Sequence, residues 1–534
     1  HEVRRVEALS GTQQVGTSPG NEITVRLDRA TSFYHDDNEV IVEITVAGGP
    51  DATRNDRAKY ITFIPGVYET VDTPDPEMTV TGRRFLSTES KRNWSVAYPG
   101  QQALQGSVSG IALLNGFPLR FPIGSVVTTP QTKGGNNAQL YGAAKKGDIF
   151  VRIDNGASAG NALAAINTQA SNGGYICIDD GSATKSEVRR LVQAVVNTTY
   201  YKLNYPLQFD HDDNASVDTV DADGGDYFDH SIIEEVDLDT VSWHVHMKES
   251  SETATKNFDR RYVGGMIGTS TISAEEGGMV SMSWDSVNFL NMVHNQANQT
   301  TVGAASGDMY YGASVAANMP RFGLMHAIDS DDIGRPGTND GTGYPNTQPY
   351  YFSQGSIKFF GTEFARIRNF TLFIANGEEP RYYLGVQGNR ARGPYEIREG
   401  AREYSMSCTV VLPDANEIAL ETAAATGQDS ALELFRQLLL EGDYGDPTAA
   451  ATARAGFTAS LRFDRGTNDY IIIDIPGSTT AGSPTAGSNQ INSQGIFINS
   501  APHNLSVENP LQVGVDMIFR GLKINIRDTE PVYP

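Results

Sequence analysis

The sequence is informative first for the chemistry it lacks. Three patterns that often carry catalysis or nucleotide binding are absent from its 534 residues: H-E-x-x-H, the P-loop and paired CxxC motifs. The nine histidines have no cysteine or serine partner in a recognised catalytic order. Pairs of acidic residues occur, but 64 acids produce such pairs by chance. We therefore expect no enzyme, no catalytic, cofactor-binding or metal-binding residues, and no cofactor.

Cysteine and long apolar runs are also scarce. The two cysteines, Cys177 and Cys408, each lie in a strand-like run, which favours two buried free thiols over a disulfide bridge. No apolar stretch approaches the roughly 20 residues of a membrane-spanning helix, and the start does not read as a signal peptide. We expect a protein that is not inserted in a membrane.

Lysine is rare, and negative charge is in excess. The chain has 11 Lys and 30 Arg against 37 Asp and 27 Glu, which gives a net charge of −23. Short carboxylates in place of long lysine stems indicate a surface adapted to high salt, where screening weakens repulsion between carboxylates. The alternative is an ordinary acidic protein. In either case the charge argues against a protein that grips DNA phosphates.

The residues that are abundant predict an all-β protein. The chain holds 54 Gly, and Ser, Thr and Asn are frequent, as expected for many short strands and turns. Its length predicts two or three domains. The clearest local pattern is a hairpin around Glu275-Glu276-Gly277-Gly278. After the turn, one set of alternating residues is apolar and the other polar: Val280, Met282 and Trp284 against Ser281, Ser283 and Asp285. We expect Trp284 to be buried.

We divide the chain into three parts. Residues 1–128 are strand-rich and include an Ile-Pro segment at Ile64 with several following prolines, and the run Gly-Ser-Val-Ser-Gly from Gly106. Residues 129–217 have a different strand pattern. They contain Ile-Cys-Ile-Asp-Asp-Gly from Ile176, then Glu-x-Arg from Glu187, then Pro-Leu-x-x-x-His from Pro206. This order resembles a small β-barrel-like module of phage structural and surface proteins, and predicts an inserted decoration.

Residues 218–534 form the third part. An aspartate run from Asp218 to Asp229 favours a solvated linker over a calcium loop, because the terminal Glu of an EF-hand is missing. His244 and His246 share one face of a strand, and an exposed polar pair is favoured over a metal site because no third ligand is identifiable. Residues 303–354 are expected to form a long loop, residues 430–442 one capped helix, and residues 457–475 a hairpin.

Taken together, the hairpin at Gly277, the Ile-Pro and Gly-Ser-Val-Ser-Gly segments, the Glu-Gly-x-Arg run from Glu399 and the lone helix resemble tail tube proteins (major tail proteins) of tailed viruses. The resemblance implies a tail-tube-like β-sandwich or barrel with one flanking helix, interrupted by the inserted module. It also implies a structural virion tail subunit, made in the host cytoplasm, that forms stacked homo-hexameric rings and contacts other tail and connector proteins.

For such a tube we expect an acidic lumen through which genomic DNA passes during ejection without specific binding, because carboxylates repel phosphates. The acidic composition adds the expectation of a halophilic archaeal host. Two alternatives remain open from the sequence: an acidic cell-surface adhesin or S-layer-like protein of a halophile, and a carbohydrate-active β enzyme, which would need a cleft with paired acids.

Overall fold

The structure is a computed structural model. It describes residues 6–10, 24–27, 68–74, 77–83, 96–135, 138–148, 150–155, 162–172, 174–181, 184–195, 200–203, 205–220, 227–247, 258–296, 348–359, 362–363, 366–383, 393–411, 459–475, 496–500, 503–504, 512–519 and 521–533. The chain divides into two compact units, one made of residues 1–47 and 132–221, the other of residues 48–131 and 222–534. Each is described by itself below.

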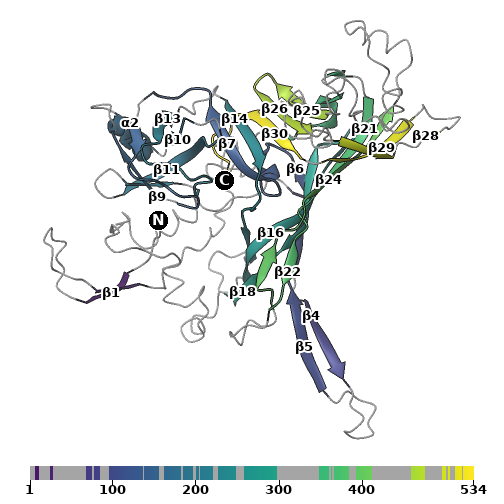
Figure 1. Cartoon of the computed structure of the whole chain (residues 1–534), viewed down its shortest axis with the longest axis horizontal. Coiled ribbons are helices and arrows are strands. Elements are labelled where there is room, and N and C mark those ends of the chain that lie inside the picture. The colour runs from purple at the N-terminus through teal and green to yellow at the C-terminus, as the bar shows by residue number, and fades with distance from the viewer. Residues whose placement is uncertain are drawn as a thin grey trace, which may run out of the picture. The chain divides into compact units, whose positions relative to one another are not determined.

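The larger unit contains an 11-stranded antiparallel sheet, here called the large sheet (Figure 1). Its main path runs β27-β29-β24-β21-β16-β17-β6-β3, with β15 and β18 paired to β16 and β28 paired to β29. In chain order the strands are β3 (Thr70–Asp72), β6 (Gln105–Ala112), β15 (Val241–Met247), β16 (Phe258–Glu275), β17 (Ser281–Asn288), β18 (Asn291–Gln296), β21 (Arg366–Ala375), β24 (Glu403–Val411), β27 (Ile496–Ser500), β28 (His503–Asn504) and β29 (Gln512–Phe519).

A second sheet of seven strands, the small sheet, has the order β20-β19-β25-β26-β30-β14-β7. Its strands are β7 (Gly124–Pro130), β14 (Phe228–Glu234), β19 (Gly355–Phe359), β20 (Thr362–Glu363), β25 (Ala459–Gly466), β26 (Asp469–Ile475) and β30 (Lys523–Asp528). Two further strand pairs in this unit stand outside both sheets: β4 (Glu77–Arg83) with β5 (Val96–Ala103), and β22 (Glu379–Arg381) with β23 (Glu396–Arg398).

One apolar core joins the large sheet to the small sheet, as in a β-sandwich. Alternate residues of the central strands point into it, for example Ile272, Met282, Leu372 and Met406 from the large sheet and Leu461, Ile473 and Ile524 from the small one. The turn between β6 and β7, which includes the 3₁₀ helix η1 (Phe117–Leu119), is buried along its whole length. The core therefore fixes which face of the large sheet remains outside.

The smaller unit contains a closed barrel of order β10-β11-β12-β9-β8-β13. The strands are β8 (Ala138–Leu140), β9 (Phe150–Asp154), β10 (Tyr175–Asp179), β11 (Glu187–Val195), β12 (Tyr200–Leu203) and β13 (Ser216–Val220). Helix α2 (Ala162–Asn172) packs against it and places Ile166 in the barrel's own apolar core. The short pair β1 (Val6–Ser10) and β2 (Thr24–Leu27) is assigned to the same unit.

The all-β prediction is confirmed, and so is the burial of Trp284, which is 2% exposed. The only α-helix among the described residues is α2, a segment for which the sequence analysis predicted no element. The expected helix at 430–442 and most of the expected loop at 303–354 lie outside the described residues. The last part of that loop belongs to the sandwich: Tyr350 is fully buried, and η3 (Phe352–Gln354) leads into β19.

Where the structure is described, no helix has the length and apolarity to cross a membrane.

Candidate functional surface

The β16–β17 hairpin sets the geometry of the outer face of the large sheet. Its turn closes with the amide of Gly278 donating to the carbonyl of Glu275 at 2.9 Å, and Gly277 has a φ of +80°, which favours glycine. Next to this turn, over residues 271–274 and 281–284, buried and partly buried residues alternate. Met282 and Trp284 enter the core, and Ser281 and Ser283 lie on the opposite face. Sequence reasoning predicted this arrangement because it is local.

Neighbouring strands extend the same outer face into rows of hydroxyl side chains. The pairing register places Ser281, Ser273, Thr371, Ser407 and Asp516 side by side across five strands, and Ser283, Thr271, Phe373, Ser405 and Ile518 in the next row. We call this outer surface of the large sheet the hydroxyl face. Phe373 and Ile518 are its partly exposed apolar members, at 37% and 49% exposure. Ser and Thr dominate the rest of these two rows.

The charged groups of the hydroxyl face are acidic. Glu275, Glu403 and Asp516 are exposed, and Asp72 and Asp285 lie towards the β3 side. Apart from Arg368, the described residues that the pairing register places on this face include no Lys or Arg. Arg368 lies at a bulge at the end of β21 and its Nε is 3.0 Å from Oε2 of Glu276, beside the hairpin turn. The face therefore offers neutral donors and acceptors together with negative charge.

Several hydroxyl groups of this face bond to one another or to acids of the same sheet. Thr271 donates to Asp285 Oδ2 at 2.5 Å, Ser500 donates to Asp516 Oδ2 at 2.6 Å, and Ser273 and Ser281 are 3.5 Å apart. Thr70 and Ser109 also share a hydrogen bond. Partial burial raises the pKa of Asp285, and the Thr271 hydrogen bond opposes that shift. These internal bonds leave fewer donors free to hold an anion.

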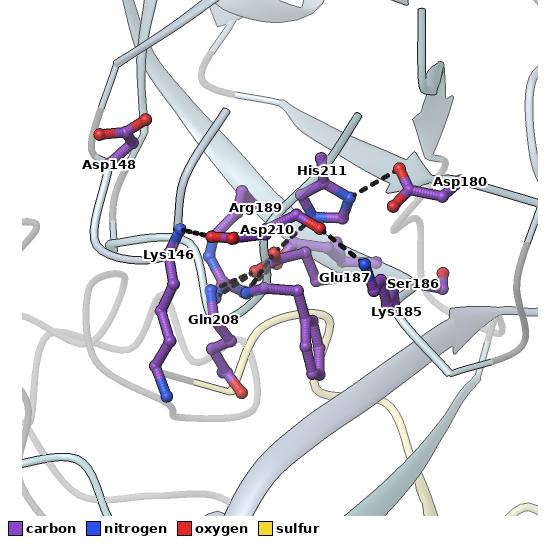
Figure 2. A network of polar contacts seen from close by, with 12 residues as sticks. Lys146, Asp148, Asp180, Lys185, Ser186, Glu187, Arg189, Gln208, Asp210 and His211 are labelled. Carbon is purple, nitrogen blue, oxygen red and sulfur yellow. Dashed lines mark hydrogen bonds and ion pairs between the residues drawn. The ribbon is translucent and has the colours of Figure 1, made fainter. Parts of the chain in front are cut away.

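The barrel unit has a different polar feature, a buried charged network (Figure 2). Glu187 is fully buried at the start of β11, and it accepts hydrogen bonds from the backbone amides of Gln208 and Phe209 at 3.0 and 3.3 Å. Arg189 lies 2.6 Å from its Oε2 and also donates to the carbonyl of Pro206. The network thus fastens residues 205–211 to β11.

His211 completes the network from the same segment. Its Nε2 is 2.7 Å from Glu187 Oε1, and its Nδ1 is 3.0 Å from Asp180 Oδ1. A neutral imidazole has one N–H, so only the imidazolium donates to both carboxylates. Burial alone would lower the pKa of His211, but the hydrogen bonds and charges of Glu187 and Asp180 outweigh it and raise that pKa. The doubly protonated ring balances the charge, with two cations against two carboxylates.

Burial and neighbouring charges also act in opposite directions on the pKa of Glu187. Burial alone would raise the pKa of Glu187, while the Arg189 charge and the His211 contact reverse this effect and lower it. Around the network, Lys146 donates its backbone amide to Asp210 at 2.8 Å, and Lys185 donates to the carbonyl of Asp210 at 3.2 Å. Asp180, Glu187 and His211 belong to the three motifs noted in residues 129–217, so these motifs meet at one place. The sequence did not predict this contact, because the motifs are separated along the chain.

Other candidate residues of the sequence lie partly outside the described structure. His244 and His246 lie on β15, and their side chains are outside the described set. The same holds for Asp221 to Asp226 of the aspartate run. Within the described part of the chain, no group of His, Cys, Asp and Glu could hold a metal ion. Cys177 and Cys408 are both buried and free, as predicted, and burial raises the pKa of the Cys177 thiol to about 11 and that of Cys408 to about 12.

Comparison with known proteins agrees with the resemblance found in the sequence. A family model described as phage tail tube protein matches residues 90–496, which is more than half of the chain and covers β6, β15, β16, β17, β18, β21 and β24 of the large sheet in full. No curated protein matches the sequence.

Proposed function

The chain belongs to the phage tail tube protein family, whose members are structural proteins of the virion tail that assemble into a tube, and from this premise we propose that its hydroxyl face lines the lumen of stacked rings. The observation that carries the proposal is the contrast between the two sides of the large sheet. One side is buried in the sandwich core, while the other presents Ser, Thr and acids and, among its described side chains, no cation apart from Arg368, which is paired with Glu276.

The topology of the large sheet suits ring closure. β3 is at one end of its main path and β27 at the other, so both are edge strands among the described residues. An edge strand exposes unpaired backbone groups, and pairing with a neighbouring subunit removes that exposure. Large sheets joined edge to edge around a ring form one closed barrel. We propose a ring of six subunits, as the family resemblance implies.

The chemistry of the hydroxyl face suits the passage of double-stranded DNA during ejection. Binding to the DNA backbone depends on Lys and Arg that neutralise phosphates and release counterions. A wall of hydroxyls holds water, and acids such as Asp516 and Glu403 repel phosphate. DNA therefore meets no site at which it would stop.

Lysine substitution on the hydroxyl face tests this proposal. We expect tubes of Thr371→Lys/Ser407→Lys protein to retain short duplex DNA at low salt and to protect it from nuclease, whereas wild-type tubes retain none. Retention should fall steeply as salt rises, since each phosphate contact contributes a slope of about −0.9 in log K against log salt. The matched control is Thr467→Lys, which places the same charge in the exposed turn between β25 and β26.

Two outcomes would contradict the proposal. Equal DNA retention by the control and the Thr371/Ser407 variant would show that added charge acts from any surface. Retained DNA that stays fully sensitive to nuclease would place the hydroxyl face outside the tube. Ser405→Lys provides a second variant on the same face in case the double variant does not assemble.

We propose further that the barrel unit is an inserted module on the tube, corresponding to the insertion expected at residues 129–217. The support is the division of the chain into two units, each with its own apolar core. In the same proposal, residues 1–128 and 218–534 make the tube domain, which contacts further rings and other tail and connector proteins in the virion.

A halophilic archaeal host is proposed from composition alone. The net charge of −23 makes subunits repel one another, and 1 M salt shortens the screening length to about 3 Å. We expect light scattering by assembled tubes to fall as salt is lowered from molar to millimolar, and uncharged osmolytes not to replace salt. Tubes that persist unchanged over that range would remove the basis for this host.

A further inference from the structure

The two-stranded ribbon β22–β23 stands apart from both sheets of the sandwich. Its strands pair in the register Glu379–Arg398, Pro380–Ile397 and Arg381–Glu396, and in the described part of the chain they pair with no third strand. The ribbon follows β21 and precedes β24, so it continues two strands of the large sheet beyond their common end (Figure 1). A lone two-stranded ribbon is at best marginally stable in water, which points to a partner.

The root of the ribbon is firmly held. Gly377 has a φ of +60°, and the amide of Gly400 donates to the carbonyl of Asn376 at 3.1 Å. A Cβ on Gly400 would lie 2.3 Å from the Gly377 carbonyl oxygen, so the two segments cross too closely for any other residue. Asn376, 2% exposed, donates to the carbonyls of Pro122 and Ile267, and Arg402 donates to its side chain at 2.8 Å. The ribbon is therefore presented in a fixed direction.

The described charges of the ribbon cancel one another. Arg381 is 2.9 Å from Glu379, and Arg398 is 2.6 Å from Glu396, so the four charged side chains sum to zero. The whole chain has a net charge of −23. Two copies of such a chain repel each other, and they do so least where a surface is locally neutral.

Beside these pairs lies a pair of exposed aromatic rings. Tyr383 is 46% exposed and Tyr395 is 71% exposed, and their ring centroids are 5.7 Å apart in an edge-to-face arrangement. The hydroxyl of Tyr383 donates to Glu396 Oε1 at 2.7 Å, which holds the ring against the ribbon. Exposed, preorganised tyrosines are typical anchors of protein interfaces.

We propose that the β22–β23 ribbon docks on a second copy of this chain in the next ring of the tube, with Tyr383 and Tyr395 as its anchors. This inference rests on the proposed function. When β3 and β27 pair around a ring, the strands tilt but run from one ring face towards the other, so the common end of β21 and β24 faces the next ring. A self-neutralised aromatic patch at that end meets the requirements of contact between two acidic subunits.

The test compares Tyr383→Ser/Tyr395→Ser with the wild type by electron microscopy and sedimentation. We expect rings without stacks, and a concentration for tube formation raised roughly tenfold or more, since interface anchors of this type are worth at least about 1.4 kcal/mol. Both residues are exposed, so the melting temperature of the subunit should not change. Tyr141→Ser, an equally exposed tyrosine of the barrel unit, is the matched control and should form normal tubes.

A second variant tests the electrostatic argument. Arg381→Glu/Arg398→Glu makes the ribbon strongly acidic, and we expect stacking to be lost at low salt and restored in molar salt. Wild-type tube formation by the tyrosine variant would overturn the proposal. Loss of rings as well as stacks, with an unchanged subunit fold, would also overturn it, because the ribbon would then act within a ring. If the wild-type protein forms no rings, the proposed function is overturned, and the proposed ribbon contact is overturned together with it.

Discussion

The sandwich and the barrel differ in the residues that they bury. The core of the sandwich is built from two large apolar faces, and the hydroxyls and acids of the large sheet remain on its outer surface. The barrel has a smaller apolar core, and Glu187, Arg189 and His211 are buried beside it at 1% exposure or less. The barrel therefore fastens residues 205–211 to β11 with buried ionic contacts, in addition to its apolar core.

The comparison also separates two roles. The sandwich keeps the hydroxyls and acids of the large sheet on its outer face, but it also buries ionisable groups of its own: His230 lies 3.3 Å from Asp528, and burial raises the pKa of Glu530. The ionic interior makes the barrel responsive to pH, because a buried ion pair is stable only while both partners stay charged.

The largest effect is expected in the sandwich core, at Trp284. The indole is 2% exposed and packs edge-to-face against Phe121 at 5.6 Å. Trp284→Ala should lower the free energy of unfolding of the sandwich by about 3–5 kcal/mol, because it leaves a large cavity. Hydrogen exchange resolved by peptide should show faster exchange in β16, β17 and β6, with the barrel peptides unchanged.

Trp284→Phe is the matched control. The indole Nε1 is buried with no hydrogen-bond partner among the described residues, so its removal breaks no bond there, and a phenyl ring still fills most of the space. We expect a much smaller loss of stability. Equal losses for Ala and Phe would mean that the indole acts through something other than volume.

Glu187→Gln should produce a comparable but smaller loss, confined to the barrel. The amide group would place hydrogen-bond donors against the donors of Arg189 and His211, and would leave their charges without a buried partner. Removing one partner of a buried pair costs about 3–5 kcal/mol, and we expect about 3 because the amide oxygen still accepts one backbone bond. Asp210→Asn, which changes a half-exposed acid nearby, should cost less than about 1 kcal/mol.

Exchange in the β10, β11 and β13 peptides measures this effect. Acceleration in the sandwich peptides as well would contradict the separation of the two units. Unchanged exchange in both units would mean that the network contributes nothing to the stability of the barrel.

These residues also show how far sequence reasoning reaches. The hairpin at Gly277 and the burial of Trp284 could be predicted because both follow from alternation within a few residues. The hydroxyl face could not, since it depends on the register that sets Ser273 beside Thr371 and Thr371 beside Ser407. The Glu-x-Arg and Pro-Leu-x-x-x-His motifs were recognised, but not their meeting. Glu187 and His211 are 24 residues apart, and only closure of the barrel brings them together.

Two other differences have local reasons. Helix α2 has no charged residue and lies in a Gly-, Asn- and Ala-rich stretch, so neither caps nor an amphipathic stripe revealed it. Tyr350 ends a segment with no periodicity, and its burial depends on partners that are distant in sequence. One of them is Asp469, whose Oδ1 accepts a hydrogen bond from the Tyr350 hydroxyl at 2.6 Å. A long loop was therefore the natural interpretation of residues 303–354.

The third perturbation is pH. The pKa of His211 is raised in the folded barrel, so its contribution is fully present below the unfolded pKa of about 6.5 and is lost as pH rises through the folded value. The pKa of Glu187 is lowered, so its contribution is present above about 4.5 and is lost as pH falls through the folded value. The barrel should therefore be most stable between about pH 4.5 and pH 6.5. Each unit by which folding shifts a pKa corresponds to about 1.4 kcal/mol in the free energy of unfolding.

Peptide-resolved exchange, corrected for the intrinsic pH dependence of the amide rate, measures the profile. His211→Gln should weaken the barrel at pH 6 and flatten the alkaline decline, while leaving the acid decline in place. A wild-type barrel whose stability does not change between pH 6 and pH 9 would show that His211 is neutral in the fold. NMR titration of the His211 ring provides an independent check of that assignment.

The smallest effect is expected from removal of the barrel itself. β7 and β14 are paired neighbours, with Pro130 opposite Phe228, and the amide of Gln131 donates to the carbonyl of Tyr227 at 3.1 Å. The intervening chain therefore leaves and re-enters the sandwich at one point, like the loop of a hairpin. Replacing residues 132–226 with a short Gly/Ser linker should leave the melting temperature of the sandwich unchanged or slightly raised, because halving a loop saves only about 0.6 kcal/mol of closure entropy. Tubes should still form. Loss of soluble protein would show that the sandwich needs the barrel in order to fold, and a soluble subunit unable to assemble would place the barrel in the contacts between subunits.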